Sequence, residues 1–258
     1  MAIITFTSDF GQRDAYVAIV KAALLNGRQQ PVVVDISHHI APANVAQAAF
    51  VLGSAFGEFP AATIHLVAID SQAGMQQRVI AAEVEGHFFI TLDNGLISLL
   101  SEWEPEKVVQ LPAAGNKGFI ARDVMAPAAL SLANGALLEE LGDPAPDIKA
   151  YARRKVKANR QEIMGHVMHV DHFGNLITNI PRHDFDILSK NKRYTIKFGR
   201  ESFHHITRSL ADVEPGDCYV TFNHLDLLEI GIRHGRAQQL LGLDFDSPVI
   251  IKFEDHAD

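Results

Sequence analysis

Acidic side chains stand at two points where the sequence predicts that a strand has just ended. Asp9 follows the apolar run 3–7, and Asp70 closes the run 63–70. Ligands of open α/β sheets bind in the crevice beyond the carboxyl ends of the strands, so both carboxylates are expected to point into one crevice. A carboxylate there can accept two hydrogen bonds from a vicinal diol such as ribose. Helix capping or turn formation explains a single strand-end Asp equally well, but two together favour a binding site.

A second group of candidates lies in the segment 170–179, VDHFGNLITN, at a predicted turn between strands. The amide of Asn175 can pair with the donor and acceptor edges of adenine, and Phe173 offers a ring face for stacking. A turn that contains Asp, Gly and Asn needs no ligand to explain it, so the segment by itself favours the turn interpretation.

Other chemistry-bearing residues give little indication of a metal site or a nucleophile. Histidines follow HxxHxxH spacing over 166–172, but on a strand their side chains alternate faces and do not converge as metal ligands. The histidine pairs 38–39 and 204–205 face the same objection. The single Cys218 excludes an internal disulfide and a Cys-rich zinc site. The chain has no GxSxG, GxxxxGK[ST] or HExxH motif and no GxGxxG after the first strand, which disfavours serine hydrolases, P-loop enzymes and zincins.

Segments of β and helical type alternate in the first half of the chain and would position these residues. The predicted order is strand 3–7, helix 14–25, strand 31–36, helix 44–59 with Asn44 as its cap, and strand 63–70. Parallel strands need crossover connections, so this order predicts a parallel sheet with both faces covered. The runs 79–84 and 87–92 predict a hairpin added to that sheet, and Asp123 is expected to cap a last helix that ends near Ala133.

The character of the sequence changes between residues 141 and 162. GDPAPD breaks regular structure, and the basic run that follows is typical of a solvated linker. The later chain consists of short β segments separated by turns, which predicts a small β-barrel or sandwich. We therefore expect an α/β domain over 1–148, a linker over 149–162 and a barrel-like β domain over 163–258.

Composition limits the classes of partner. With 23 Lys and Arg against 31 Asp and Glu, the net charge of −8 disfavours a general nucleic-acid binder. An apolar fraction of 47% over 258 residues is enough for a sizeable core. The N-terminus lacks the pattern of a secretory signal, and no apolar run approaches the ~18 residues that span a membrane. These features predict a cytoplasmic protein with neither a membrane nor a nucleic-acid partner.

Five separated blocks of the sequence, kept in order, resemble the S-adenosylmethionine (SAM) hydroxide adenosyltransferase family, which is related to the fluorinase and chlorinase enzymes. The blocks cover residues 5–22, 33–70, 93–98, 121–135 and 171–181. The resemblance implies an N-terminal α/β domain and a C-terminal β-barrel. It also implies a homotrimer in which the ligand lies between the N-terminal domain of one subunit and the C-terminal domain of its neighbour.

The same resemblance assigns roles to the candidate residues. Asp9 would hold the ribose hydroxyls, while Phe173 and Asn175 would stack on and hydrogen-bond the adenine, with Asp171 beside them. The full set expected to bind substrate is Asp9, Phe10, Phe119, Asp171, Phe173 and Asn175.

The hydrolases of this family convert SAM and water to adenosine and L-methionine by in-line attack at the ribose 5′ carbon. The substrate is a small nucleoside compound, and no cofactor or metal is expected. Asp70 occupies the position of the hydrolase acid, where the halogenating relatives carry Tyr, and it would orient the water or accept its proton. Attack by halide ranks below attack by water, because Asp70 would repel an anion in a desolvated pocket.

Two positions depart from the Asp, Arg and His triad of the hydrolases. The Arg falls on Gln77, with Arg78 next to it, and the His falls on Ile120, which cannot transfer a proton. Arg78 faces the opposite side of an extended segment and can substitute only if the backbone shifts by one residue. Asp70, Arg78 and Gln77 are the catalytic candidates. The alternative function is a catalytically impaired protein that binds SAM or adenosine, and compensation by His172 or His224 stays open.

Overall fold

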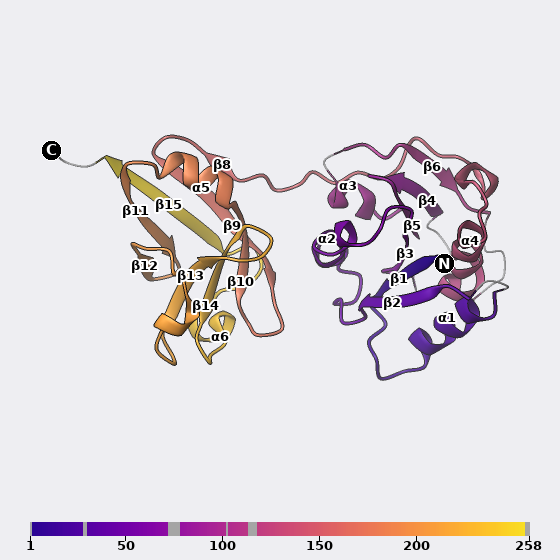
Figure 1. Ribbon diagram of the computed structural model, residues 1–258, viewed down its shortest axis with the longest axis horizontal. Coiled ribbons are helices and arrows are strands. Elements are labelled where there is room, and N and C mark those ends of the chain that lie inside the picture. The colour runs from indigo at the N-terminus through magenta and orange to yellow at the C-terminus, as the bar shows by residue number, and fades with distance from the viewer. Residues whose placement is uncertain (1, 28–29, 72–77, 102, 113–117, 256–258) are drawn as a thin grey trace. The chain divides into compact units, whose positions relative to one another are not determined.

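A computed structural model describes residues 2–27, 30–71, 78–101, 103–112 and 118–255. The chain forms two compact units, unit 1 over Met1–Arg153 and unit 2 over Arg154–Asp258 (Figure 1). Unit 1 is α/β and unit 2 is built almost entirely of antiparallel strands, as the sequence predicted. Of the helices in the described ranges, none is long and apolar enough to cross a membrane.

Unit 1 is organised around a seven-stranded mixed sheet with the order β2-β1-β3-β5-β4-β6-β7. The first four strands of this order are parallel, and the other three are antiparallel to their neighbours. The predicted hairpin of β4 and β5 is confirmed, and β5 also extends the parallel half by pairing with β3. The strands are β1 (Ile3–Ser8), β2 (Val32–Ser37), β3 (Ile64–Ala68), β4 (Val79–Val84), β5 (His87–Leu92), β6 (Lys107–Gln110) and β7 (Asp143–Pro144).

Helices cover both faces of this sheet, as predicted. Along β3, Leu66 and Ala68 enter one core while Val67 enters another, because successive side chains of a strand point to opposite faces. The first core contains α1 and α4 and the second contains α2 and α3. The helices are α1 (Tyr16–Leu25), α2 (Val45–Gly53), α3 (Leu96–Leu100) and α4 (Ala126–Ala133), with short turns η1 (Phe56–Glu58), η2 (Ala121–Met125) and η3 (Leu138–Glu140).

One predicted cap is confirmed and the other is wrong. Asn44 caps α2, since its Oδ1 accepts the N–H of Gln47 at 3.0 Å. Asp123 does not begin the last helix, because the π-helical turn η2 runs directly into α4 and places Asp123 inside helical backbone. Its carboxylate instead reaches back to the N–H of Phe119 at 3.3 Å and binds the adjacent Arg122. The helical segment therefore starts earlier than the acidic residue suggested.

Unit 2 is a barrel-like antiparallel sheet in the order β12-β11-β15-β9-β10-β14-β13, with β8 paired to β9. The N–H of Thr207, just after the β12 edge, donates to the carbonyl of Val220 on the opposite edge strand at 2.7 Å, which brings the two edges together. The strands are β8 (Lys157–Ala158), β9 (Glu162–Val170), β10 (Leu176–Pro181), β11 (Lys192–Phe198), β12 (Glu201–Phe203), β13 (Cys218–Phe222), β14 (Leu227–Ile232) and β15 (Pro248–Asp255).

Unit 2 also contains short helical segments that the sequence did not predict. They are α5 (Arg182–Leu188), α6 (Ala237–Leu241) and the turn η4 (Leu210–Asp212). At no more than seven residues each, they are too short to show a helical apolar repeat.

Candidate functional site

The carboxyl ends of β1, β2 and β3 lie at one edge of the unit 1 sheet, because the three strands are parallel neighbours. Asp9 follows β1, Ala43 lies in the loop after β2, and Asp70 follows β3. One oxygen of Asp9, Oδ2, accepts the N–H of Ala43 at 2.9 Å and the N–H of Asp70 at 3.0 Å. A single carboxylate oxygen thus joins three loops and brings the backbone of Asp70 to the side chain of Asp9.

Both backbone groups that donate to Asp9 belong to residues in the left-handed region. The φ angle is 60° at Ala43 and 58° at Asp70. Asp tolerates this conformation better than Ala, for which it costs roughly 1–2 kcal/mol. Both donors to the Asp9 carboxylate therefore carry backbone strain at the point where the loops converge.

Arg78 is held by two acidic residues of unit 1. Its Nε donates to Asp93 Oδ2 at 2.6 Å, its Nη1 donates to Asp147 Oδ1 at 3.3 Å, and its Nη2 donates to the carbonyl of Asp147. The bond to Asp93 is the main cause that raises the pKa of Arg78. The guanidinium is therefore fixed beside the end of β5, the fourth parallel strand. Gln77, the other candidate for the triad Arg position, lies outside the described residues.

Asp93 was not among the predicted site residues. It directly follows the apolar run 87–92, so the strand-end rule that selected Asp9 and Asp70 would also have selected it. Its side chain is 10% exposed, and its Oδ1 accepts the N–H of Lys149 at 2.8 Å. Tyr151, followed by the carboxylates of Asp93 and Asp70, raises the pKa of Lys149. Lys149, the first residue of the basic run that follows GDPAPD, therefore lies near Asp93 and Asp70.

We expect the replacement of Asp93 by alanine to lower the free energy of unfolding by about 1–3 kcal/mol, because it leaves the partly buried Arg78 guanidinium without its main acceptor. Urea unfolding at neutral pH measures the change. The matched control is Lys107→Ala, which removes an ion pair with Glu139 in which both side chains are more than half exposed and should change nothing measurable. Equal losses in the two variants would contradict a structural role for the Arg78–Asp93 pair.

Three aromatic rings meet beside the Asp9 loop. The ring centroids of Phe10 and Phe119 are 5.7 Å apart, and Tyr16 lies 5.9 Å from Phe10 and 5.7 Å from Phe119. The structure thus brings Phe10 and Phe119 together in one aromatic cluster. Tyr16, the first residue of α1 and 47% exposed, was not predicted, although an aromatic residue at a predicted helix start was visible in the sequence.

Ile120, at the position of the triad His, is 5% exposed and belongs to the apolar core under α1 and α4. Its side chain therefore packs in the interior. His172 and His224, considered as substitutes, are exposed in turns of unit 2.

In unit 2 the predicted turn at residues 171–175 is present. Asp171 Oδ1 accepts the N–H of Asn175 at 2.8 Å, and Oδ2 accepts from Asn175 Nδ2 at 3.0 Å. Gly174 has φ +85°, and a Cβ there would lie 2.8 Å from the Cβ of Arg236. Phe173 projects from the turn with 72% of its surface exposed, so its ring faces are open for stacking.

Two further residues of unit 2 extend this cluster and were not predicted. The hydroxyl of Tyr219 lies 3.4 Å from both Asn175 Oδ1 and Glu229 Oε1. Burial raises the pKa of Tyr219 to about 12 and also raises that of Glu229. Tyr219 therefore stays protonated as a hydrogen-bond donor. In the sequence, both residues look like ordinary members of alternating strands.

No group of three or more His, Cys, Asp or Glu side chains in the described part of the chain is placed to hold a metal ion.

Comparisons with known proteins cover nearly the whole chain. The N-terminal domain of the SAM hydroxide adenosyltransferase family matches residues 4–142, and its C-terminal domain matches 165–250. A protein of Thermus thermophilus named (R)-S-adenosyl-L-methionine hydrolase is 32% identical over 96% of this chain and 99% of its own. A fluorinase of Actinoplanes is 26% identical over 71% of this chain and 73% of its own. The crystal structure of an uncharacterized conserved protein from Thermotoga maritima has a TM-score of 0.86 at 28% identity, covering 96% of this chain and 99% of that one.

Proposed function

Because the chain belongs to the SAM hydroxide adenosyltransferase family, we propose that it hydrolyses SAM to adenosine and L-methionine. The observation that carries the proposal is the contact between Asp9 and Asp70 at the converging ends of β1 and β3. Asp70 stands where the family resemblance expects the hydrolase acid. Relatives named (R)-S-adenosyl-L-methionine hydrolase, about 30% identical over most of the chain, support the substrate.

In the proposed reaction, the oxygen of water attacks the ribose 5′ carbon while the bond from that carbon to sulfur breaks. The electron pair of the broken bond stays on sulfur, so methionine leaves as a neutral thioether and needs no acid. The site must supply an aligned water and exclude bulk solvent. Asp70 would orient that water or accept its proton. No cofactor takes part.

Asp9 would have two tasks in this mechanism. Its Oδ2 receives the backbone of Asp70 and so fixes the acid in its left-handed conformation. No described residue donates to Oδ1, which is left to accept a ribose hydroxyl. The rings of Phe10 and Phe119 would supply an apolar wall. Phe173 and Asn175 are proposed to receive the adenine, and a homotrimer with sites shared between subunits is the proposed assembly.

The replacement of Asp70 by asparagine is expected to lower the rate of adenosine formation at least 100-fold, because the amide cannot accept the proton of the water. The purified protein is incubated with SAM, with and without chloride, and adenosine, methionine and haloadenosine are followed by chromatography. Glu104→Gln, a change at an exposed residue of unit 1, is the matched control and should keep the wild-type rate. An undiminished rate in Asp70→Asn would exclude this mechanism, and a chloride-dependent product would favour halide attack.

A second candidate function is binding of SAM or adenosine without turnover. Two observations favour it, namely the burial of Ile120 in the core and the fixation of Arg78 by Asp93 and Asp147. Ile120 cannot transfer a proton, and Arg78, the neighbour of the triad Arg position, is already held by two acidic residues. This function predicts saturable binding in calorimetry with SAM recovered intact. Formation of adenosine and methionine together by the wild-type protein would exclude it.

A further inference from the structure

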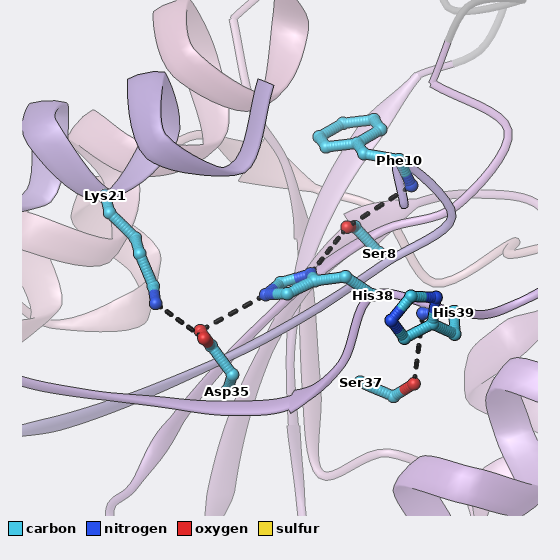
Figure 2. Close-up of polar contacts among 7 residues, drawn as sticks. All are labelled: Ser8, Phe10, Lys21, Asp35, Ser37, His38 and His39. Atoms are coloured by element: carbon cyan, nitrogen blue, oxygen red, sulfur yellow. Dashed lines mark hydrogen bonds and ion pairs between the residues drawn. The ribbon is translucent and has the colours of Figure 1, made fainter. Parts of the chain in front are cut away.

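A chain of polar side chains runs through unit 1 from α1 to the end of β1 (Figure 2). Lys21 Nζ lies 2.5 Å from Asp35 Oδ2, and Asp35 Oδ1 lies 3.2 Å from His38 Nε2. His38 Nδ1 is 2.7 Å from Ser8 Oγ, which in turn accepts the N–H of Phe10 at 3.4 Å. The chain thus ends on the backbone of the loop that carries Asp9.

The chain passes from the surface into the interior. The side chains of Lys21 and Asp35 are about one-third exposed, whereas Ser8 is fully buried and His38 is 1% exposed. Burial lowers the pKa of His38 despite the opposing effect of Asp35, so the imidazole is neutral at physiological pH. His38 Nδ1 and Ser8 Oγ share a hydrogen bond, and the same Ser8 oxygen accepts the N–H of Phe10.

The order Ser8, His38 and Asp35 is that of a nucleophilic triad, but the geometry does not support that role. Substrate cannot reach a serine hydroxyl that has no exposed surface. Asp35 is also shared with the Lys21 ammonium, and His38 Nε2, although 3.2 Å from Asp35 Oδ1, forms no aligned hydrogen bond with it. These side chains can set geometry but cannot attack a ligand.

His38 holds the Asp9 loop from both sides. Its side chain bonds to Ser8, the residue before Asp9, and its carbonyl accepts the N–H of Gly11, the residue after Phe10, at 2.8 Å. The ring of Phe6 packs edge-on against the imidazole, with centroids 4.7 Å apart, and restricts its rotation. The two residues between these contacts are the ones proposed to bind ribose and to line the apolar wall.

We propose that His38, acting through Ser8, is a positioning residue that sets Asp9 and Phe10 for binding of the nucleoside. The identity of the ligand rests on the proposed function. A role in positioning predicts that losing the contact weakens binding of adenosine and raises KM, while kcat changes little, since none of these side chains reaches the reacting atoms.

Two substitutions at His38 separate its contacts. In His38→Asn the amide lies near the position of Nδ1 and can keep the bond to Ser8, whereas in His38→Gln it lies near Nε2 and keeps only the contact with Asp35. We expect the Kd for adenosine, measured by calorimetry on the full chain, to rise five- to tenfold in His38→Gln and in Ser8→Ala, and less than threefold in His38→Asn. Lys21→Met, at the solvent end, should change it less than twofold.

Hydrogen exchange of the Phe10 amide is the second measurement and needs no ligand. Exchange should be faster in Ser8→Ala and His38→Gln than in His38→Asn, after correction for the global stability of each variant. Equal affinity for adenosine and equal exchange of the Phe10 amide in all three variants would overturn the proposal. It would also be overturned if kcat fell and KM rose together, in proportion to the loss of global stability of each variant. If the wild-type protein binds neither adenosine nor SAM, the proposed function fails, while the exchange measurement still decides whether His38 fixes the loop.

Discussion

In Asp9→Ala, the free energy of unfolding should fall by about 2 kcal/mol, and adenosine should bind at least 10-fold more weakly. The stability loss arises because the carboxylate accepts from the backbone of both Ala43 and Asp70, and hydrogen bonds to a charged acceptor contribute roughly 1.5–3 kcal/mol each when well buried. The expected loss of stability is smaller than the sum of two such bonds, because Ala43 is exposed and its N–H can form a hydrogen bond with water instead. Urea unfolding and calorimetry measure the two effects.

Asp9→Asn separates the structural task of Asp9 from its task toward a ligand. The amide oxygen can still accept from the two backbone groups, so the stability loss should be less than half of that in Asp9→Ala. The amide nitrogen, now in the place of Oδ1, cannot accept a ribose hydroxyl proton, so the affinity should still fall. Glu104→Ala, at an exposed residue, is the control for both measurements. If Asp9→Ala kept wild-type stability, the junction of the three loops would not depend on this carboxylate.

Mild acid is expected to destabilise the protein through a pair of buried histidines in unit 1. His65 has no exposed surface, its Nδ1 lies 2.7 Å from Thr5 Oγ1, and its Nε2 lies 3.2 Å from His87 Nδ1. Burial, reinforced by the neighbouring His87, lowers the pKa of His65 to about 3, and burial also lowers the pKa of His87. Both imidazoles are therefore neutral in the folded protein at pH 7.

The sign of the effect follows from proton binding. In the unfolded chain a histidine has a pKa near 6.5, so between pH 6.5 and about 3 the unfolded state binds more protons at His65 than the folded state. The full stability is present above pH 6.5, and each pH unit below it removes about 1.4 kcal/mol for this one group. His65 alone should therefore lower the free energy of unfolding by about 2 kcal/mol between pH 7 and pH 5.

Urea unfolding at pH 7, 6 and 5 tests this expectation. The variant His65→Leu should show a flatter dependence on pH whatever its absolute stability, because the titrating group is gone. His234→Leu, at an exposed histidine in unit 2, should keep the wild-type slope. A wild-type slope in His65→Leu would show that other groups cause the acid sensitivity.

Local sequence determined the architecture of both units. Apolar residues alternate or run continuously over 3–7 and 63–70. Such a pattern predicts a strand with one or both faces buried, whatever the strand packs against. The cap at Asn44 depends only on the N–H three residues ahead, so it too was predictable. The motif blocks identified the family because residue order and spacing need no coordinates.

The site was predictable only in part, since its contacts join distant parts of the chain. The predicted strand ends identified Asp9 and Asp70. They did not show that one oxygen of Asp9 accepts N–H groups from residues 34 and 61 positions away, because that contact depends on the strand order and on left-handed backbone at both donors. Asp93 as the partner of Arg78 depends on the register of the β4–β5 hairpin. The contact of Ser8 with His38, 30 residues apart, needs adjacent parallel strands.

The physical reason for this division is the range of the interactions. Periodicity, capping and turn formation act over a few residues, so the sequence by itself specified the longer strands, most of the helices of unit 1 and the turn at 171–175. The short strands β6, β7, β8 and β12 were not predicted, and β7 lies in the GDPAPD segment that was expected to break regular structure. Which polar groups meet, and which are buried when they meet, is decided by packing of elements far apart in the chain. The tertiary structure therefore decided that Ile120 is a core residue, that Tyr16 joins Phe10 and Phe119, and that His38 holds the loop of Asp9.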